Sequence, residues 1–192
     1  IPLHLICDAS GLGRREYYTK LKAEGKYFAY GVSKCSKGHS LASRRGECIQ
    51  CKTAIIAYSM RHIRSGFIYI AGSMQTSLIK IGVTGDPLNR IYLANLVGYE
   101  YAGACDWRVL YWAQVDKAGE CETIIHRALS VYQTAIPFVR NGINQTAREC
   151  FRCDYAIARK KANIAMLLND IHPGDEWEEA DSITNEYNLR SA

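Results

Sequence analysis

GFIYIAGSMQTSLIKIGVTGDPLNR, residues 66–90, is the stretch that decides how the centre of this chain folds. Two short runs within it, 67–71 and 78–83, are rich in isoleucine and other apolar residues, and a polar connector separates them. This pattern predicts a β-hairpin with a longer loop. Asp86 and Pro87 follow, and these residue types favour the cap and the first position of a helix, so a helix is expected to begin there.

The predicted hairpin and helix carry three polar side chains on neighbouring elements. Tyr69 lies on the first strand, Lys80 lies on the second strand, and Arg90 lies on the first turn of the helix. Two paired strands and the helix that directly follows them lie side by side, so these three groups are expected to converge.

The same stretch resembles the GIY-YIG nuclease superfamily. The matching residues are Phe67-Ile68-Tyr69 for the first motif, Lys80-Ile81-Gly82 for the second, and then Thr84, Pro87 and Arg90. Lys80 stands where the second tyrosine usually stands, and a lysine there also occurs in phage-type and restriction-enzyme-like branches. The resemblance covers roughly residues 65–170 and implies an α+β fold, with a small antiparallel β-sheet flanked by helices.

The resemblance also implies a function, the metal-dependent hydrolysis of phosphodiester bonds in DNA. Tyr69 would accept a proton from the attacking water, and it needs a nearby cation because a free tyrosine has a pKa near 10. Lys80 on the paired strand would be that cation, or would relay the proton itself. Arg90 would hold the scissile phosphate and stabilise its developing charge. Without the order of the motifs, Tyr69 would be interpreted as a core aromatic residue and Lys80 as a lysine at the solvated end of a strand.

Two carboxylates compete as the ligand of a catalytic Mg²⁺ or Mn²⁺ ion. Glu122 lies where the resembled family usually has its metal-binding glutamate, four residues before His126, and residues at this spacing share a face of a helix. Glu149, in the sequence Arg-Glu-Cys-Phe, is the alternative. A single carboxylate with phosphate and water suits magnesium, so one of the two is enough.

Four cysteine and histidine residues follow a zinc-ligand pattern, Cys-x3-His-x8-Cys-x2-Cys, formed by Cys35, His39, Cys48 and Cys51. Zinc prefers four such ligands in a tetrahedron, and the short Cys-x2-Cys pair presents two thiolates from one turn. The stretch resembles a short zinc ribbon with a structural ion. The alternative, reduced cysteines in an apolar core, fits poorly with the polar residues around them.

The charge of the chain favours a polyanionic partner, which we expect to be DNA. The net charge is +5, but residues 173–192 hold six acidic side chains and one basic one, so the rest keeps 23 basic against 13 acidic side chains, a net charge of +10. Arg44 and Arg45, between the zinc-ligand pairs, are candidates for DNA contact. Arg14 and Arg15 are further candidates on a predicted N-terminal helix, although such charge is usually a solvated helix face.

The order of these features predicts an N-terminal helical segment (1–33), a zinc ribbon-like module (34–60), a nuclease-like domain (61–172) and an acidic tail (173–192). The remaining expectations are a helix over 14–24, a strand over 53–63, a strand over 107–115, a helix over 116–131, a loop over 133–148, a helix over 155–171 and a loosely held tail.

The clustered cysteines indicate metal ligation more than disulfides, so an intracellular location, in the cytoplasm or with the nucleoid, is expected. No run of about 18 apolar residues is present, so no membrane-spanning segment is expected. Restriction, mobile-element and phage-defence roles all fit an endonuclease, and cutting both strands would need a homodimer or two events. The alternatives are a non-catalytic nucleic-acid-binding protein on the same scaffold and an RNA-binding zinc ribbon.

Overall fold

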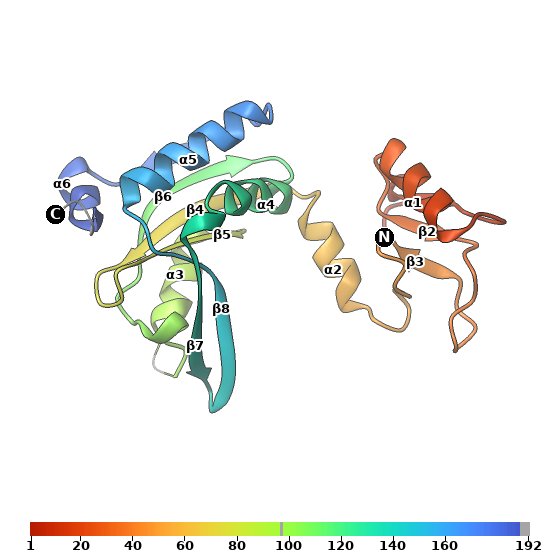
Figure 1. Cartoon of the computed structure of the whole chain (residues 1–192), viewed down its shortest axis with the longest axis horizontal. Helices are drawn as coiled ribbons and strands as arrows, with labels where there is room; N and C mark the ends of the chain where they lie inside the picture. Colours follow the sequence, from red (N-terminus) through yellow and green to blue (C-terminus); the bar gives the residue numbers. More distant parts are fainter. Residues whose placement is uncertain (97, 189–192) are drawn as a thin grey trace. The chain divides into compact units, whose positions relative to one another are not determined.

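A computed structural model describes residues 1–96 and 98–188 of the chain. It shows an α+β fold in two compact units, Ile1–His62 and Ile63–Ala192, and each unit has its own β-sheet (Figure 1). The predicted α+β class is confirmed, whereas the finer division into four segments stays a prediction. The helices are α1 (Arg14–Ala23), α2 (Ala54–Arg61), α3 (Pro87–Asn95), α4 (Ala118–Ala128), α5 (Tyr155–Leu168) and α6 (Asp181–Thr184). The strands are β1 (Ile6–Asp8), β2 (Phe28–Tyr30), β3 (Leu41–Ser43), β4 (Gly66–Ser73), β5 (Leu78–Thr84), β6 (Arg108–Val115), β7 (Gln133–Arg140), β8 (Ile143–Phe151) and β9 (Glu176–Glu178).

The first unit is built on a three-stranded sheet in the order β1-β2-β3. Helix α1 connects β1 to β2, which run parallel, and β3 returns antiparallel to β2. Tyr17 and Leu21, one helical turn apart on α1, are buried with Cys7 and Ala29 of the sheet. The expected helix over 14–24 is therefore present, and the apolar stripe on one of its faces attaches it to the sheet.

Helix α2 corrects the expectation of a strand over 53–63. Its isoleucines, Ile55 and Ile56, favour strands by propensity. None of its residues is buried, however, and a strand would need a neighbouring strand to satisfy its backbone groups. A helix satisfies those groups internally, and Tyr58 packs edge to face on His62, one turn later, with 5.0 Å between the ring centres.

The second unit is organised around a six-stranded sheet in the order β7-β8-β5-β4-β6-β9, in which neighbouring strands are antiparallel. The predicted hairpin is β4–β5, the predicted helix after it is α3, and the expected strand over 107–115 is β6. Asp86 caps α3, because its Oδ1 accepts a hydrogen bond from the backbone N–H of Asn89 at 3.0 Å. Pro87 occupies the first helical turn, as the sequence indicated.

The central strands are buried on both faces, and their alternation sends successive side chains to two different cores. Ile68 and Ile70 of β4 face one core together with α4 and α5, while Tyr69 and Ala71 face the other together with α3. The short 3-10 turn Tyr101–Gly103 covers the second core as well. Figure 1 shows α4 and α5 on one side of the sheet and α3 on the other.

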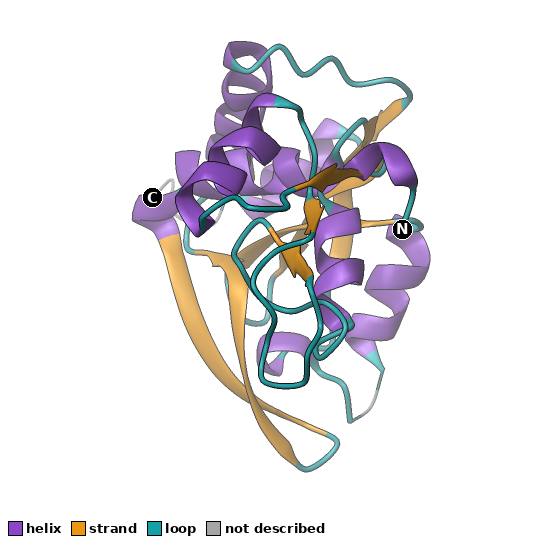
Figure 2. Ribbon diagram, turned by 90° about the vertical axis from the view of Figure 1, so that its right-hand side faces the viewer, coloured by secondary structure: helices purple, strands orange, loops and turns teal. Residues whose placement is uncertain are grey.

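Strands β7 and β8 correct the expected loop over 133–148. They form a long antiparallel hairpin that is prominent in Figures 1 and 2. Asn141 and Gly142 make its turn, both with positive φ angles of 48° and 75°, which is the conformation that Asn-Gly favours in two-residue hairpin turns. The Asn-Gly pair was the sequence signal for this hairpin, and Pro137 obscured it because proline is rare inside strands.

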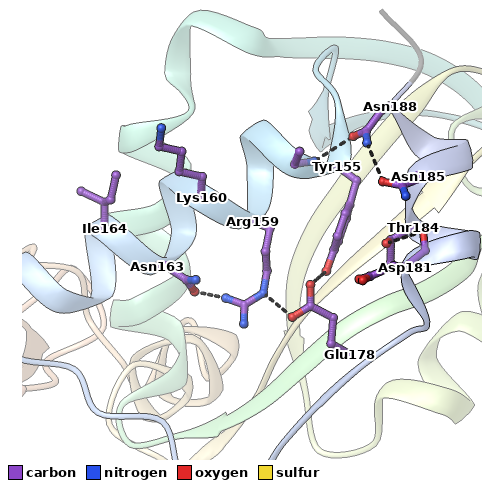
Figure 3. Close-up of a pocket in the computed structure, with 11 residues that line it drawn as sticks. Tyr155, Arg159, Lys160, Asn163, Ile164, Glu178, Asp181, Thr184, Asn185 and Asn188 are labelled. Atoms are coloured by element: carbon purple, nitrogen blue, oxygen red, sulfur yellow. Dashed lines mark hydrogen bonds and ion pairs between the residues drawn. The ribbon is translucent and has the colours of Figure 1, made fainter. Parts of the chain in front are cut away.

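The tail corrects a third expectation, since its described part, residues 173–188, is held against the sheet. Strand β9 pairs with the outer edge of β6, and α6 and the 3-10 turn Asn185–Tyr187 follow. Glu178 accepts hydrogen bonds from the Tyr155 hydroxyl at 2.5 Å and from Nε of Arg159 at 3.0 Å (Figure 3). Composition alone indicated a solvated tail, but its carboxylates have specific partners on α5 and β6. Arg190, the base of this segment, lies outside the described residues.

Candidate functional site

Tyr69 and Lys80 enter the same core from neighbouring strands. In the β4–β5 register Tyr69 lies opposite Gly82 and Ala71 lies opposite Lys80, so both side chains project from the α3 side of the sheet. Both are buried, with 0% of Tyr69 and 1% of Lys80 exposed. A fully buried lysine is rare unless its charge is paired, so its partners define the site.

The ammonium group of Lys80 has one anionic partner and two aromatic ones. It forms an ion pair with the carboxylate of Glu149. The ring centre of Tyr101 lies 4.3 Å from Nζ, and that of Tyr69 lies at 5.7 Å, so both are within the range of cation–π attraction. Burial alone would lower the pKa of Lys80, but Tyr69 and Glu149 outweigh it and raise the pKa above its ordinary value. Lys80 is therefore a fixed positive charge beside Tyr69.

A β-bulge brings Glu149 to Lys80. Strands β7 and β8 pair at Thr134 with Cys150 and at Ile136 with Ala147, so β8 has one more residue than β7 between these pairs. Without the bulge, Ala147 and Cys150 would face opposite sides, yet both lie in the core of Tyr69. Bulges of this kind redirect side chains, and here the bulge includes Glu149.

The hydroxyl of Tyr69 is the buried polar side-chain atom for which the described residues offer no hydrogen-bond partner. Its ring lies against Gly82, so closely that a Cβ atom added there would be 2.8 Å from the hydroxyl oxygen. The third residue of the second motif is thus a glycine because the tyrosine of the first motif occupies the space of a side chain. An unpaired buried hydroxyl is costly, and such groups often have a catalytic role or bind water.

Arg90 lies on the first turn of α3, and the next residue, Ile91, packs into the core that contains Tyr69. The side chain of Arg90 is exposed and forms no hydrogen bond or ion pair within the described residues. The structure therefore leaves Arg90 available to an anion from solution.

Glu122 and His126 lie on the other side of the sheet from Tyr69. Their helix, α4, packs its Cys121 and Ile125 against the core formed with α5. Nε2 of His126 is 3.0 Å from the carbonyl oxygen of Ile81, which accepts the hydrogen bond. Glu122 is half-buried one turn before His126, so the pair flanks the second half of β5. Of the predicted catalytic residues, the structure gathers Tyr69, Lys80 and Glu149, and it places Glu122 and His126 apart from them.

The four predicted zinc ligands converge in the first unit. The ligand atoms of Cys35, His39, Cys48 and Cys51 all lie within 4.8 Å of one another, the one such group of three or more among residues 1–96 and 98–188. The Sγ atoms of Cys35 and Cys51 are 3.8 Å apart, and Nδ1 of His39 is 3.3 Å from Sγ of Cys51 and 3.7 Å from Sγ of Cys48. Two sulfurs on a tetrahedral zinc ion with bonds of about 2.3 Å would be about 3.8 Å apart, so the cluster has the size to hold one zinc ion.

The backbone around this cluster favours a thiolate. The N–H of Lys37 points to Sγ of Cys35 at 3.4 Å and, as the largest cause, lowers the pKa of Cys35 to about 6. Gly38 and Gly46 turn with φ angles of 79° each, a conformation that favours glycine. The donor set and the turns fit a closed structural zinc site more than a catalytic one.

The predicted DNA-contacting arginines differ in their surroundings. Arg44 is half-buried, with its guanidinium 4.0 Å above the ring centre of Tyr27 and Nε donating to the carbonyl of Lys26 at 2.6 Å. Arg45, Arg14 and Arg15 are exposed. Arg14 also donates to the carbonyl oxygen of Arg45 at 2.5 Å, which leaves part of its guanidinium for another partner. A role of these arginines in DNA binding stays a prediction.

Sequence reasoning missed Tyr101, whose ring faces Lys80. Trp107 and Phe138 pack on this ring at 6.0 and 5.4 Å between ring centres. Tyr101 lies in a 3-10 turn in which Ala102 has a φ of 56°, a conformation uncommon for residues other than glycine. Neither a motif nor a periodic pattern links Tyr101 to Lys80, so no sequence signal could have found it.

Fold and site together define an α+β protein with a metal-ligand cluster in one unit and a buried lysine–glutamate–tyrosine cluster in the other. A comparison with protein families matches residues 66–165 to the T5orf172 domain, just over half of the chain, and the chain belongs to that family. It is a phage-associated domain in the nuclease-related group of GIY-YIG and HNH-like domains, so the family associates this chain with nucleic acid. Searches of curated proteins and of solved structures returned no match. Among the described helices, none has the length and apolar character needed to cross a membrane.

Proposed function

We propose that this protein is a metal-dependent endonuclease that hydrolyses phosphodiester bonds in DNA, of the GIY-YIG type that its motifs resemble. The observation that carries the proposal is the buried, charged Lys80, paired with Glu149, beside the Tyr69 hydroxyl, which has no hydrogen-bond partner within residues 1–96 and 98–188. Membership of a nuclease-related family supports the same reaction. A restriction, mobile-element or phage-defence role is compatible with it.

Each residue of the site has a part that its chemistry suits. Arg90, exposed on the first turn of α3, would bind the scissile phosphate and stabilise the charge that develops on it. Tyr69 would accept the proton of the attacking water, because its hydroxyl has no hydrogen-bond partner among the described residues and its ring lies beside the charged Lys80. Glu149 would keep Lys80 in place.

One of the two candidate glutamates would hold the catalytic metal ion. Mg²⁺ or Mn²⁺ takes a carboxylate together with phosphate oxygens and water. The carboxylate of Glu149 is already paired with Lys80, which competes with a metal ion. Glu122 stands where the resembled family usually has its metal-binding glutamate, so it is the first candidate, although it lies on the other face of the sheet from Tyr69. A bound metal ion would stabilise the negative charge on the leaving oxygen.

The first unit would supply DNA affinity. Residues 1–62 hold 11 basic and 4 acidic side chains, a net charge of +7, whereas residues 63–192 hold 13 basic and 15 acidic side chains, a net charge of −2. A zinc ion on Cys35, His39, Cys48 and Cys51 would keep this small unit folded. One catalytic site per chain would cut one strand, so a homodimer on DNA would be needed to cut both at once.

The second candidate function is a non-catalytic DNA-binding protein on the same scaffold. The burial of Tyr69 and Lys80 favours this alternative, since neither side chain is open to solvent. The two functions differ in whether DNA is cut.

The test is the nicking of supercoiled plasmid DNA by the purified, zinc-loaded chain with added Mg²⁺ or Mn²⁺. We expect nicking that Arg90→Ala and Glu122→Ala each reduce by about 100- to 1,000-fold, with DNA affinity nearly unchanged. Arg152→Ala, an exposed arginine between β8 and α5, is the matched control and should nick normally. If Glu122→Ala nicks normally, Glu122 does not hold the metal ion, and Glu149 is the remaining candidate. If the wild type binds DNA and never cuts it with either ion, the binding function replaces the nuclease.

A further inference from the structure

The β7–β8 hairpin, called here the ribbon (133–151), extends beyond the sheet to which it belongs. Strand β8 pairs with β5 at two positions, Ile79 with Phe151 and Lys80 with Cys150, both at the base of the ribbon. Above this base the two strands pair with each other as far as Arg140 and Ile143. The ribbon is therefore a two-stranded arm, as Figures 1 and 2 show.

One face of the ribbon is supported from behind. Ile136 and Phe138 pack against the core of the Tyr101 turn. Near the tip, the guanidinium of Arg140 lies 4.3 Å from the ring centre of Tyr99, and the N–H of Asn141 donates to the carbonyl of Gly98 at 3.0 Å. Contacts at the base and at the tip hold the ribbon in one position, so it would bind a partner with little loss of conformational entropy.

The other face is open. Pro137 pairs with Thr146 and Val139 pairs with Asn144, and the alternation of strands turns these four side chains away from the supported face. All four are exposed, and Val139 is 56% exposed. The surface combines amide, hydroxyl and apolar groups.

The charge around this face suits a polyanion. The stretch from 123 to 148 has no acidic residue in 26 positions, although acidic residues outnumber basic ones in residues 63–192 as a whole. Arg140 and Arg148 lie at the two ends of the ribbon, and Arg148 is exposed. A phosphate backbone could approach this face without repulsion from a carboxylate of the stretch.

The outer edge of the ribbon argues against a protein partner that would add a strand. Strand β7 is the last strand of the sheet, and Pro137 in its middle has no N–H to donate to another strand. The open face, not the edge, is the surface left for recognition.

We propose that the open face of the ribbon enters the major groove of duplex DNA and reads its sequence, with Asn144 and Thr146 at the base edges and Arg148 at a phosphate. Two strands about 4.8 Å apart with their side chains fit a groove about 12 Å wide. Asparagine pairs with adenine, threonine hydroxyls contact any base, and the apolar Val139 suits the methyl group of thymine. This inference rests on DNA being the substrate, and it names the element that selects the site.

The ribbon also connects recognition to the site. Arg148 and Glu149 are adjacent in the β-bulge, and the carboxylate of Glu149 binds the ammonium of Lys80. A DNA phosphate bound at Arg148 would therefore lie next to Glu149, the residue that pairs with Lys80.

The experiment is the selection of random-sequence duplexes by the full zinc-loaded chain without added Mg²⁺ or Mn²⁺, so that binding is measured without cutting. The wild type should enrich a motif. The Asn144→Ala/Thr146→Ala double variant should lose discrimination by roughly 5- to 150-fold at one or two base pairs of that motif. The matched control is Gln145→Ala, which lies between them in the sequence, pairs with Phe138 and belongs to the other face. It should enrich the wild-type motif.

Two further measurements separate base contacts from backbone contacts. Arg148→Ala should weaken binding to all sequences and reduce the slope of log affinity against log salt by about 1. Replacing the purines of the motif with 7-deazapurines removes major-groove acceptors and should weaken wild-type binding but not binding by the double variant.

The inference is overturned if the wild type enriches no motif, if the double variant keeps the wild-type motif, or if 7-deazapurines bind as well as purines. A protein that binds its motif through the ribbon but never nicks plasmid would overturn the nuclease function and leave the ribbon as the reading element. A protein that nicks DNA, but whose motif does not depend on the ribbon, would support the nuclease function and overturn the ribbon as the reading element.

Discussion

Tyr69→Phe removes one oxygen atom, and we expect the variant to be at least as stable as the wild type while it loses cleavage. The hydroxyl of Tyr69 is fully buried and has no partner among the described residues. Leaving such a group unpaired costs about 1–3 kcal/mol, so its removal should leave the free energy of unfolding unchanged or raise it by up to this amount. At about 2–4 °C per kcal/mol, the melting temperature should rise by up to about 12 °C. If the hydroxyl takes the proton from water, cleavage should fall by about 10²- to 10⁴-fold.

Gly82→Ala tests the same contact from the opposite strand. Its new Cβ would lie 2.8 Å from the Tyr69 hydroxyl oxygen and 3.1 Å from Cζ of the ring, so the side chain or the strand must move. We expect a loss of about 1–3 kcal/mol of stability, as for other overpacked cores. In the Tyr69→Phe background the closest contact is gone, and the loss should be smaller by at least about 0.5 kcal/mol.

Urea denaturation and plasmid nicking measure the two effects on the same four proteins. Unfolding midpoints for wild type, both single variants and the double variant give the coupling energy, and nicking with Mg²⁺ gives the rates. A Tyr69→Phe variant that loses stability would show that the hydroxyl has a partner. A stable variant that cuts normally would show that Tyr69 serves packing alone, and Lys80 or another group would then activate the water.

Three further predictions follow from the charged and metal-binding groups. Glu149→Gln should lower the free energy of unfolding, and with it the urea midpoint, because it leaves the Lys80 charge buried without its anion. The loss should be smaller than the about 3–5 kcal/mol of a fully buried pair, because the Glu149 side chain is 32% exposed, and an unchanged midpoint would contradict the ion pair. Metal analysis should find about one zinc per chain in the wild type and none in Cys48→Ser, and full zinc in that variant would exclude the proposed ligand set. DNA affinity should fall steeply with added salt, by about 10³-fold between 50 and 200 mM for six phosphate contacts, whereas a salt-independent affinity would indicate a partner other than nucleic acid.

The parts of the fold that the sequence predicted are those in which the signal and its cause lie close together. The hairpin of β4 and β5 needs a four-residue connector, and α3 needs the cap of Asp86 and the proline beside it, so each signal lies within the segment that it shapes. The zinc-ligand pattern is also local, because Cys35 and Cys51 are 16 residues apart and the turns between them are short.

The predictions that proved wrong concern segments whose local pattern is mixed or misleading. The two strands of the ribbon pair mainly with each other, but Pro137 and the mixed polar and apolar side chains of the open face obscured the strand pattern. The composition of the acidic tail indicates a solvated segment, and only the structure shows that β6 and α5 provide partners for its carboxylates. The 53–63 segment contains strand-forming isoleucines, but it forms the helix α2, and none of the residues of this helix is buried.

The sequence by itself determined the α+β class, the order of the central elements, the Cys/His cluster that could hold zinc and the residues of the resembled motifs. Only the tertiary structure decided which of them meet. Lys80 and Glu149 are 69 residues apart, and a one-residue bulge in β8 decides that the carboxylate reaches the lysine. Glu122 and Tyr69 are separated by the sheet because strand alternation and helix packing send them to opposite faces. A register and a bulge are set by the closing of long loops and the packing of whole faces, and no short stretch of sequence contains that information.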